Sequence, residues 1–406
     1  MAPATGDATG DAAATAGVPD GSPGKALGVL DSSSNEQSGT AVADVPPKRR
    51  IEGECIVAPV VGIIANPVSA RDIRRVVANA AGLQIADRAN IVLRVLAALK
   101  ACGIEDAVMM PEQGGIGSHV ERGLTRARLR GEATYPALRR LDMPVTGTVA
   151  DTHRAAAEMR RLGVSAIVVL GGDGTHRAVV AHCGAVPVAG ISTGTNNAFP
   201  EHREPTITGL ATGLAVTGLI PAPVAFAANK RIDVTVNDAD EPEIALVDVA
   251  LVTERYVGAR ALWRPESFRE LYVTFADPQV IGMSAIAGLV EPVERGESGG
   301  LMLRLAPADS RAEGIVLQAP IAPGLMARIG VTDWRRMPAG VPFLPEAKAG
   351  SIALDGEREI SFSVRDRVRL TLRDEAFRTV DVGGCMRHAA LNRLLAGVPA
   401  PVAAAL

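Results

Sequence analysis

The stretch SAIVVLGGDGTHRAVV, residues 165 to 180, decides the fold of this protein. It begins with a run of branched apolar residues, which is typical of a strand buried on both faces. The run ends in three glycines around one aspartate, and a helix-like pattern follows at once. Such a strand places backbone N–H groups at the carboxyl end of a parallel sheet, in the crevice where these sheets bind ligands. The stretch therefore predicts a phosphate-binding turn between a strand and a helix.

The segments before and after this turn alternate between strand and helix patterns. We expect strands at 57–67, 106–111, 165–170 and 186–193. We expect helices at 70–80, 89–103, 118–130 and 151–163, the last with Asp151 as its N-cap. Alternation of this kind predicts a parallel sheet with helices on both faces.

The pattern changes after about Phe226. Segments of β type, separated by turn residues, occupy 230–236, 243–252, 270–276, 314–321, 351–364 and 368–373. The predicted fold is therefore α/β, with an N-terminal Rossmann-like domain built on a parallel sheet and a mostly antiparallel β domain after it. We expect a disordered tail at 1–50, an α/β nucleotide-binding domain at 55–225, a β-rich domain at 226–375, and a C-terminal segment at 376–406 that packs back on the first domain.

Composition restricts the class of protein. The chain of 406 residues is long enough for two domains with separate cores, and its formal net charge of −3 indicates neither a nucleic-acid surface nor a polybasic membrane patch. Its four cysteines form no CxxC pair, which argues against a disulfide framework and a zinc knuckle. No apolar run is long enough for a membrane span. We expect a cytoplasmic homo-oligomer that acts on a small molecule, with no nucleic acid as partner.

The glycine turn supplies the first candidate site residues. Gly171, Gly172 and Gly174 let the backbone approach a phosphate and adopt unusual dihedral angles, and Thr175 can cap the helix or donate its hydroxyl. Asp173 needs a reason to lie beside a phosphate, because its charge repels one. It can hold Mg²⁺ or take a proton from an attacking hydroxyl. The alternative is a tight turn in which aspartate and glycine supply only turn geometry.

A second polar loop follows the next strand. The segment GTNNAFP after the strand at 186–193 reads as a small-residue turn at the start of a short helix. Its polar groups suit phosphate or ribose oxygens, and with the preceding residue they are Thr193, Gly194, Thr195, Asn196 and Asn197. Two such loops at neighbouring strand ends can share one ligand.

Two further groups have open roles. Asp355 and Glu357 lie in ALDGERE, where DG is also a common hairpin turn, so a functional and a structural role are equally open. Arg71, Arg74 and Arg75 follow a strand-end NP turn. They either clamp a polyphosphate or form the solvated face of the first helix.

Together these motifs resemble the superfamily of NAD kinases, diacylglycerol kinases and sphingosine kinases. The shared elements are GGDGT after a strand, GTNN one unit later and LDGE in a following β domain. Within the superfamily, GIIANPVSARDIRR, MMPE, DTHRAAAEM, VVLGGDGTHR and STGTNNAFP look most like the ATP-NAD kinase-like proteins called acetoin catabolism protein X. The resemblance implies that Gly171 to Thr175 contact nucleotide phosphates and that Asp173 is base or metal partner for the accepting hydroxyl. It also implies ligand contacts from Asn66, Asn196 and Asn197.

Two departures leave the acceptor open. The β domain lacks the Thr/Ser/Gly-rich segment with a tyrosine that NAD kinases carry, and Asn197 replaces the carboxylate of the lipid-kinase form Gly-Thr-x-Asn-Asp. We expect a kinase that uses ATP or polyphosphate with Mg²⁺ and phosphorylates a hydroxyl, NAD being the first-choice acceptor. The alternatives are a lipid or other small-molecule kinase and a catalytically silent nucleotide-binding regulator.

Overall fold

The computed structural model of the protein describes residues 58–67, 83–132, 134–194, 197–253, 265–310, 313–356 and 358–396. All of them belong to one unit of the chain, which begins at Val45. The tail expected at 1–50 and the helix expected at 70–80 lie outside the described residues.

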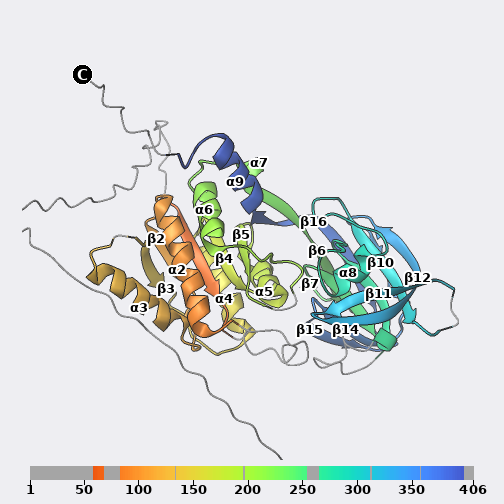
Figure 1. Ribbon diagram of the computed structural model, residues 1–406. Coiled ribbons are helices and arrows are strands. Elements are labelled where there is room, and N and C mark those ends of the chain that lie inside the picture. Colours follow the sequence, from red (N-terminus) through yellow and green to blue (C-terminus); the bar gives the residue numbers. More distant parts are fainter. Residues whose placement is uncertain are drawn as a thin grey trace, which may run out of the picture. The chain divides into compact units, whose positions relative to one another are not determined.

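Five parallel strands form the part of the structure that the alternating pattern predicts (Figure 1). In sheet order they are β3 (Ala137–Arg140), β2 (Asp106–Met109), β1 (Val60–Ala65), β4 (Ala166–Gly171) and β5 (Val188–Ser192). Every residue of β4 is buried, as the branched apolar run predicts. Strand β3 was not expected, because its sequence ALRR is mostly exposed at the sheet edge and shows no apolar pattern.

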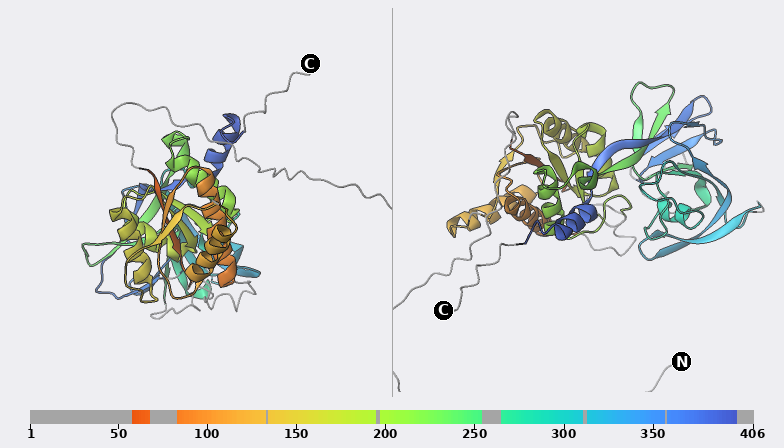
Figure 2. Two further views of the ribbon diagram at one scale, coloured as in Figure 1. Left: turned by 90° about the vertical axis from the view of Figure 1, so that its left-hand side faces the viewer. Right: turned by 90° about the horizontal axis from the view of Figure 1, so that it is seen from above.

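Helices cover both faces of this parallel region (Figure 2), which confirms the predicted α/β class. One face packs against α2 (Ile85–Ala101), α3 (Ile116–Leu129), α6 (Pro205–Val216) and α9 (Val382–Leu391), with the short α7 (Ala222–Ala225) beside them. The other face packs against α4 (Val149–Arg161) and α5 (Asp173–Cys183). Neighbouring residues of β1 serve the two faces in turn, because side chains alternate along a strand: Ile63 lies in the first core and Ile64 in the second.

Helix α6 was not expected, because its sequence PTITGLATGLAV is rich in threonine and glycine. The structure shows what the glycines do. A Cβ at Gly209 would lie 2.8 Å from the Cβ of Ala98, and one at Gly213 would lie 2.8 Å from the Sγ of Cys102. The small residues therefore let α6 approach α2 closely, and tertiary packing outweighs their low helix propensity.

The N-cap expected at Asp151 is wrong. Helix α4 has Thr148 as its N-cap residue, and Asp151 is the third residue of the helix. The Asp151 carboxylate instead accepts from the backbone N–H groups of Thr146 (2.9 Å) and Gly147 (2.7 Å), which precede the helix. A carboxylate in the first turn reaches back in the same way in a capping box.

The sheet continues beyond β5 with antiparallel strands. These are β16 (Val368–Val380), β6 (Phe226–Val236) and β7 (Glu243–Ala245), and the short β13 (Pro342–Phe343) pairs with β16. Strand β16 pairs in parallel with β5 at Thr379 and Val188, and antiparallel with β6. Residues from both predicted domains thus share one sheet, and the boundaries expected at 225 and 375 stay predictions.

A second, wholly antiparallel sheet completes the β-rich part. Its order is β11 (Ile315–Ala322), β12 (Leu325–Met337), β10 (Gly300–Pro307), β9 (Phe268–Val273), β8 (Asp248–Val252), β14 (Gly350–Leu354) and β15 (Arg358–Phe362). One of its faces packs on β6, β7 and β16, and the other packs on α8 (Met283–Gly288). A 3₁₀ turn, η3 (Pro265–Ser267), precedes β9. None of the described helices combines the length and apolar character needed to span a membrane.

Candidate functional site

The carboxyl ends of β1, β4 and β5 meet at one edge of the sheet. Ala65 pairs with Leu170, and Gly171 pairs with Ser192, so the three strands end level with one another. The next residues continue this contact: the Asn66 N–H donates to the carbonyl of Leu170 at 3.3 Å, and the Thr193 N–H donates to that of Gly171 at 3.1 Å. Open α/β sheets bind their ligands at this edge, outside the carboxyl ends of the strands.

Asn66 and Thr175 come together here although 109 residues separate them. The Asn66 side-chain amide donates to the Thr175 hydroxyl at 3.1 Å. Thr175 is the third residue of α5, whose first-turn N–H groups have no acceptor within the helix. The structure therefore brings two of the predicted contact residues to a helix N-terminus, where a phosphate is favoured.

Asp173 is the first residue of α5, and its side chain is held by the loop that follows β5. One carboxylate oxygen accepts from the backbone N–H of Ala198 at 3.0 Å and the other from that of Phe199 at 2.9 Å. The residue is only 7% exposed. A negative charge at this position is also stabilised by the helix dipole. Asp173 thus joins the two glycine-containing loops, a connection that the sequence did not show.

The glycines of the two loops accommodate the side chain of Asn197. A Cβ at Gly172 would lie 2.7 Å from Asn197 Oδ1, and one at Gly194 would lie 2.5 Å from Asn197 Nδ2. The Asn197 amide donates to the Ser192 hydroxyl at 2.9 Å. The prediction of an unusual dihedral angle at Gly172 is wrong. The φ of Gly172 is −98°, which other residues also adopt. Close approach of a side chain, rather than backbone strain, requires glycine here.

Two other glycines of the turn are buried in its structure. Gly171 is the last residue of β4, and a Cβ there would meet the side chain of Thr175. Gly174 is the second residue of α5 and is buried. Gly171 thus lies at the strand end and Gly174 in the first helical turn, and we expect both to lie near a bound phosphate.

The short helix expected directly after GTNN is absent from the described residues. Residues 197–204 are irregular, and the next helix, α6, begins at Pro205. Glu204 caps that helix by accepting from the Ile207 N–H at 3.1 Å. The loop is therefore held by side chains from other elements and not by a helix of its own.

Arg88 is a buried cation at this edge that sequence reasoning missed. It lies in α2, has no exposed surface, and donates to the backbone carbonyl of Asn66 at 2.7 Å. It also lies 3.5 Å from the Thr193 hydroxyl and carbonyl oxygens. The sequence could have indicated its burial, because Arg88 lies one helical turn before Val92 and therefore on the apolar face of α2.

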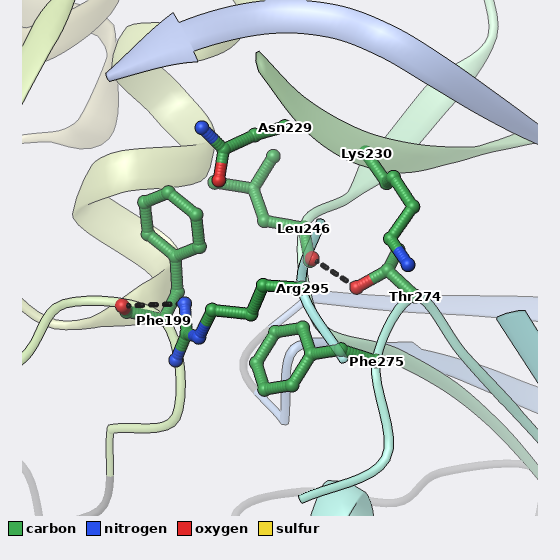
Figure 3. Close-up of a pocket in the computed structure, with 7 residues that line it drawn as sticks. All are labelled: Phe199, Asn229, Lys230, Leu246, Thr274, Phe275 and Arg295. Carbon is green, nitrogen blue, oxygen red and sulfur yellow. Dashed lines mark hydrogen bonds between the residues drawn. The ribbon is translucent and has the colours of Figure 1, made fainter. Parts of the chain in front are cut away.

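Arg295 reaches the same loop from the β-rich part (Figure 3). Its guanidinium donates to the carbonyls of Ala198 and Phe199, the second at 3.0 Å, and lies 4.1 Å from the ring centre of Phe275. Burial lowers the pKa of Arg295, while the carboxylates of Glu201 and Asp173 oppose that shift. The spacing of VERGE gives no signal for this role.

A small cavity lies beside Arg295. Its volume is about 10 Å³, and its lining residues are Phe199, Asn229, Lys230, Leu246, Thr274, Phe275 and Arg295 (Figure 3). That volume is at the lower limit for one water molecule. The cavity is therefore a packing gap between the loop after β5 and the β-rich part, and not a nucleotide site.

Asp355 pairs with Arg177 of the helix that follows the glycine turn. Its carboxylate accepts from the backbone N–H groups of Leu246 (3.0 Å) and Val247 (2.8 Å), and it lies 3.5 Å from the Arg177 guanidinium of α5. Burial raises the pKa of Asp355, and Arg177 and the N–H groups act in the opposite direction. Asp355 therefore links the β7–β8 connection to Arg177 in the middle of α5.

The remaining predicted residues are not described. Arg71, Arg74, Arg75, Thr195, Asn196 and Glu357 lie outside the described residues. Their expected ligand contacts stay predictions.

The described side chains do not form a metal site of their own. Within the described ranges, no group of three or more His, Cys, Asp or Glu side chains is placed to hold a metal ion. Asp173 already accepts an N–H on each oxygen. A Mg²⁺ ion at this edge therefore fits only as an ion whose ligands come mainly from polyphosphate oxygens and water, as is usual for Mg²⁺.

Comparison with known proteins agrees with this architecture. Residues 61–218 match the family model of the ATP-NAD kinase N-terminal domain, and residues 230–375 match that of the acetoin catabolism protein X C-terminal domain. The first match covers β1 to α6, including the edge where Asn66, Asp173 and Thr175 lie. The N-terminal part of the chain is thus a domain of the ATP-NAD kinase type.

A curated relative defines the family more narrowly. The acetoin catabolism protein X of Cupriavidus necator is 55% identical over 351 residues, which are 86% of this chain and 97% of that protein. The chain belongs to the acetoin catabolism protein X family. Among solved structures, a protein proposed to be a diacylglycerol kinase from Bacillus anthracis matches with a TM-score of 0.37 and 14% identity, over 80% of this chain and 96% of that one.

Proposed function

We propose that this protein is a nucleotide-dependent kinase that transfers a phosphoryl group to a hydroxyl, with NAD as the first-choice acceptor. The observation that supports this most is the meeting of Asn66, Asp173, Thr175 and Thr193 at the N-terminus of α5. Phosphoryl transfer depends on positioning and charge stabilisation more than on covalent chemistry. Backbone N–H groups and hydroxyls at a helix N-terminus provide such positioning, with ATP or polyphosphate as donor.

Asp173 would orient the accepting hydroxyl. Each carboxylate oxygen accepts one backbone N–H, and a carboxylate oxygen can accept more than one hydrogen bond, so the hydroxyl of a bound acceptor can donate to Asp173. The two N–H donors fix the direction in which the carboxylate oxygens point, so the carboxylate can orient the hydroxyl. Mg²⁺, when bound with the phosphates, would neutralise their charge.

A second candidate is a nucleotide-binding protein without turnover. The engagement of both Asp173 oxygens and the amide of Asn197, in place of a carboxylate, favour this candidate. One assay separates the possibilities: purified protein with ATP and Mg²⁺, supplied with NAD or with a diacylglycerol mixture, and read out as NADP or as phosphorylated lipid. Binding of ATP and NAD with neither product selects the silent protein.

Replacing Asp173 tests the proposed role. In Asp173→Asn one oxygen still accepts its N–H and the other becomes an NH₂ group, so one of the two bonds to the loop remains. We expect a folded protein that still binds ATP. Its turnover should fall by about a hundredfold to ten-thousandfold, the usual effect of losing a positioned acid–base group. Steady-state rates of NADP formation and ATP titration measure both. Asp142→Asn, on an exposed aspartate after β3, is the control and should keep full activity. Turnover of Asp173→Asn within a few-fold of the parent would leave Asp173 a structural residue.

A further inference from the structure

The loop segment Ala198–Phe199 is held from two opposite sides. Its two N–H groups donate to Asp173, and its two carbonyls accept from Arg295. We propose that Arg295 is a positioning residue, which holds this segment so that the segment in turn orients the Asp173 carboxylate. The consequence for turnover rests on the proposed function, whereas the effect on the loop does not.

The contact suits arginine specifically. The planar guanidinium presents N–H groups in a fixed fork, and here two of its nitrogens serve two successive carbonyls. A carbonyl that bonds to a cation gains more than one that bonds to a neutral donor. A lysine ammonium in the same place would be a point charge with freely turning donors and would fix the two peptide units less well.

Arg295 is itself held in place by the β-rich part. Its guanidinium carbon lies 4.1 Å from the Phe275 ring centre and 5.7 Å from that of Phe199, which is the range of cation–π contacts. The segment that carries it is tied down on both sides: Val293 pairs with Ala276 in an isolated β-bridge. On the other side, the Lys230 ammonium donates to the carbonyls of residues 294, 297 and 299.

This arrangement links the β-rich part to the Asp173 carboxylate through one short segment. Each Asp173 oxygen bonds to one N–H of the segment, so a shift of the segment moves both hydrogen-bond partners together. Without Arg295, the two carbonyls lose their cationic donor, while the bonds to Asp173 and the packing of the Phe199 ring against His176 and Phe377 remain. The backbone bonds to Asp173 should then open more often.

Hydrogen exchange of the Ala198 and Phe199 amides tests the structural half directly. We expect Arg295→Met to speed their exchange by about tenfold or more, since bonds to a charged donor are lost, and Arg295→Lys to give an intermediate rate. Arg336→Met is the matched control. Arg336 bonds to Glu291 and Glu297, which flank Arg295 in sequence, and among the described residues its hydrogen bonds do not reach the loop after β5. Its variant should leave the two amides within about twofold of the parent.

Kinetics test the catalytic half on the acceptor that the parent phosphorylates. We expect Arg295→Met to lower kcat by about 10-fold to 100-fold while the KM for ATP changes less than about threefold, because the residue acts on the Asp173 carboxylate and not on the nucleotide. Arg295→Lys should recover part of kcat, and Arg336→Met should keep it.

The outcomes are distinguishable. Unchanged amide exchange in Arg295→Met, or an equal increase in Arg336→Met, overturns the inference. Faster exchange with an unchanged kcat overturns its catalytic half. If the parent makes no phosphorylated product, the proposed function fails, and amide exchange still decides whether Arg295 holds the loop. If Arg295→Met does not fold, the Arg295→Lys comparison carries both measurements.

Discussion

His176 lies buried beneath the glycine turn in its neutral form. It has no exposed surface, and its Nδ1 lies 2.9 Å from the carbonyl of Gly172, so Nδ1 carries the proton and donates. Its Nε2 is buried and has no hydrogen-bond partner among the described residues, and a Cβ at Gly190 would lie 2.8 Å from it. Burial lowers the pKa of His176 to about 4, because it removes the hydration that stabilises a charged imidazolium.

This burial predicts a loss of stability in acid. The unfolded chain binds a proton at His176 below its ordinary pKa of 6.5, and the folded chain does so only near 4. The contribution of the neutral His176 to the free energy of unfolding is therefore fully present above pH 6.5. It falls by about 3 kcal/mol in total as the pH drops toward 4. Urea unfolding at several pH values should show this slope in the parent and a reduced slope in His176→Gln. His119→Gln, on the partly exposed helix α3, should keep the parental slope; equal slopes for all three proteins would contradict the expectation.

The turn between β14 and β15 shows how one element depends on another. Asp355 has the left-handed φ of 48° that the DG pattern favours. Its carboxylate does more than shape the turn, because it accepts the N–H groups that connect β7 to β8 and lies beside Arg177 of α5. A structural and a functional role were equally open in the sequence, and the observed contacts support a structural one.

Asp355→Ala should therefore be strongly destabilising. It removes the acceptor of buried N–H groups and the charge opposite Arg177, which keeps its bond to the Leu354 carbonyl. Breaking a buried pair in this way costs about 3 to 5 kcal/mol. Asp355→Asn keeps one acceptor and tolerates the same φ, so its cost should be smaller. Glu375→Ala is the matched control, since Glu375 also has φ 48° but is exposed. Denaturant titration measures all three, and a loss below about 1 kcal/mol for Asp355→Ala would mean that the pair contributes little.

At the scale of the whole molecule, the end of the chain returns to the first sheet. Strand β16 pairs with both β6 and β5, and α9 follows it at once. Val382, Cys385 and Ala389 of α9 are buried in the core that also holds α2 and α6. The parallel half of the sheet is therefore completed by residues from the far end of the sequence.

The two ends of the chain should respond differently to deletion. Removing residues 1–50 should leave the melting temperature unchanged, because their composition offers little apolar surface to bury. Removing residues 381–406 takes three buried side chains from the core and should lower the free energy of unfolding by about 3 to 6 kcal/mol. Thermal and urea unfolding of both truncated proteins provide the comparison. A stable protein without α9, or a large loss without the N-terminal residues, would contradict it.

The sequence by itself determined the α/β class and the place of the glycine turn. Both follow from local periodicity: branched runs such as that of β4 are buried on both faces, and helical spacing starts again at Asp173. Predictions failed where local pattern and packing disagreed. The exposed β3 has no apolar pattern, and α6 is made of residues with low helix propensity that a close contact with α2 stabilises.

The tertiary structure alone decided which polar groups meet. Arg88, Arg177 and Arg295 each bond to a residue about 20 to 180 positions away in the chain, and their partners are mostly backbone carbonyls, which every residue has. The sequence pattern does not predict such a partner, because the order of the strands in the sheet determines which loops lie side by side. The role of Asp173 shows the difference: its motif indicated a site, and only the folded chain showed that its carboxylate also holds the neighbouring loop.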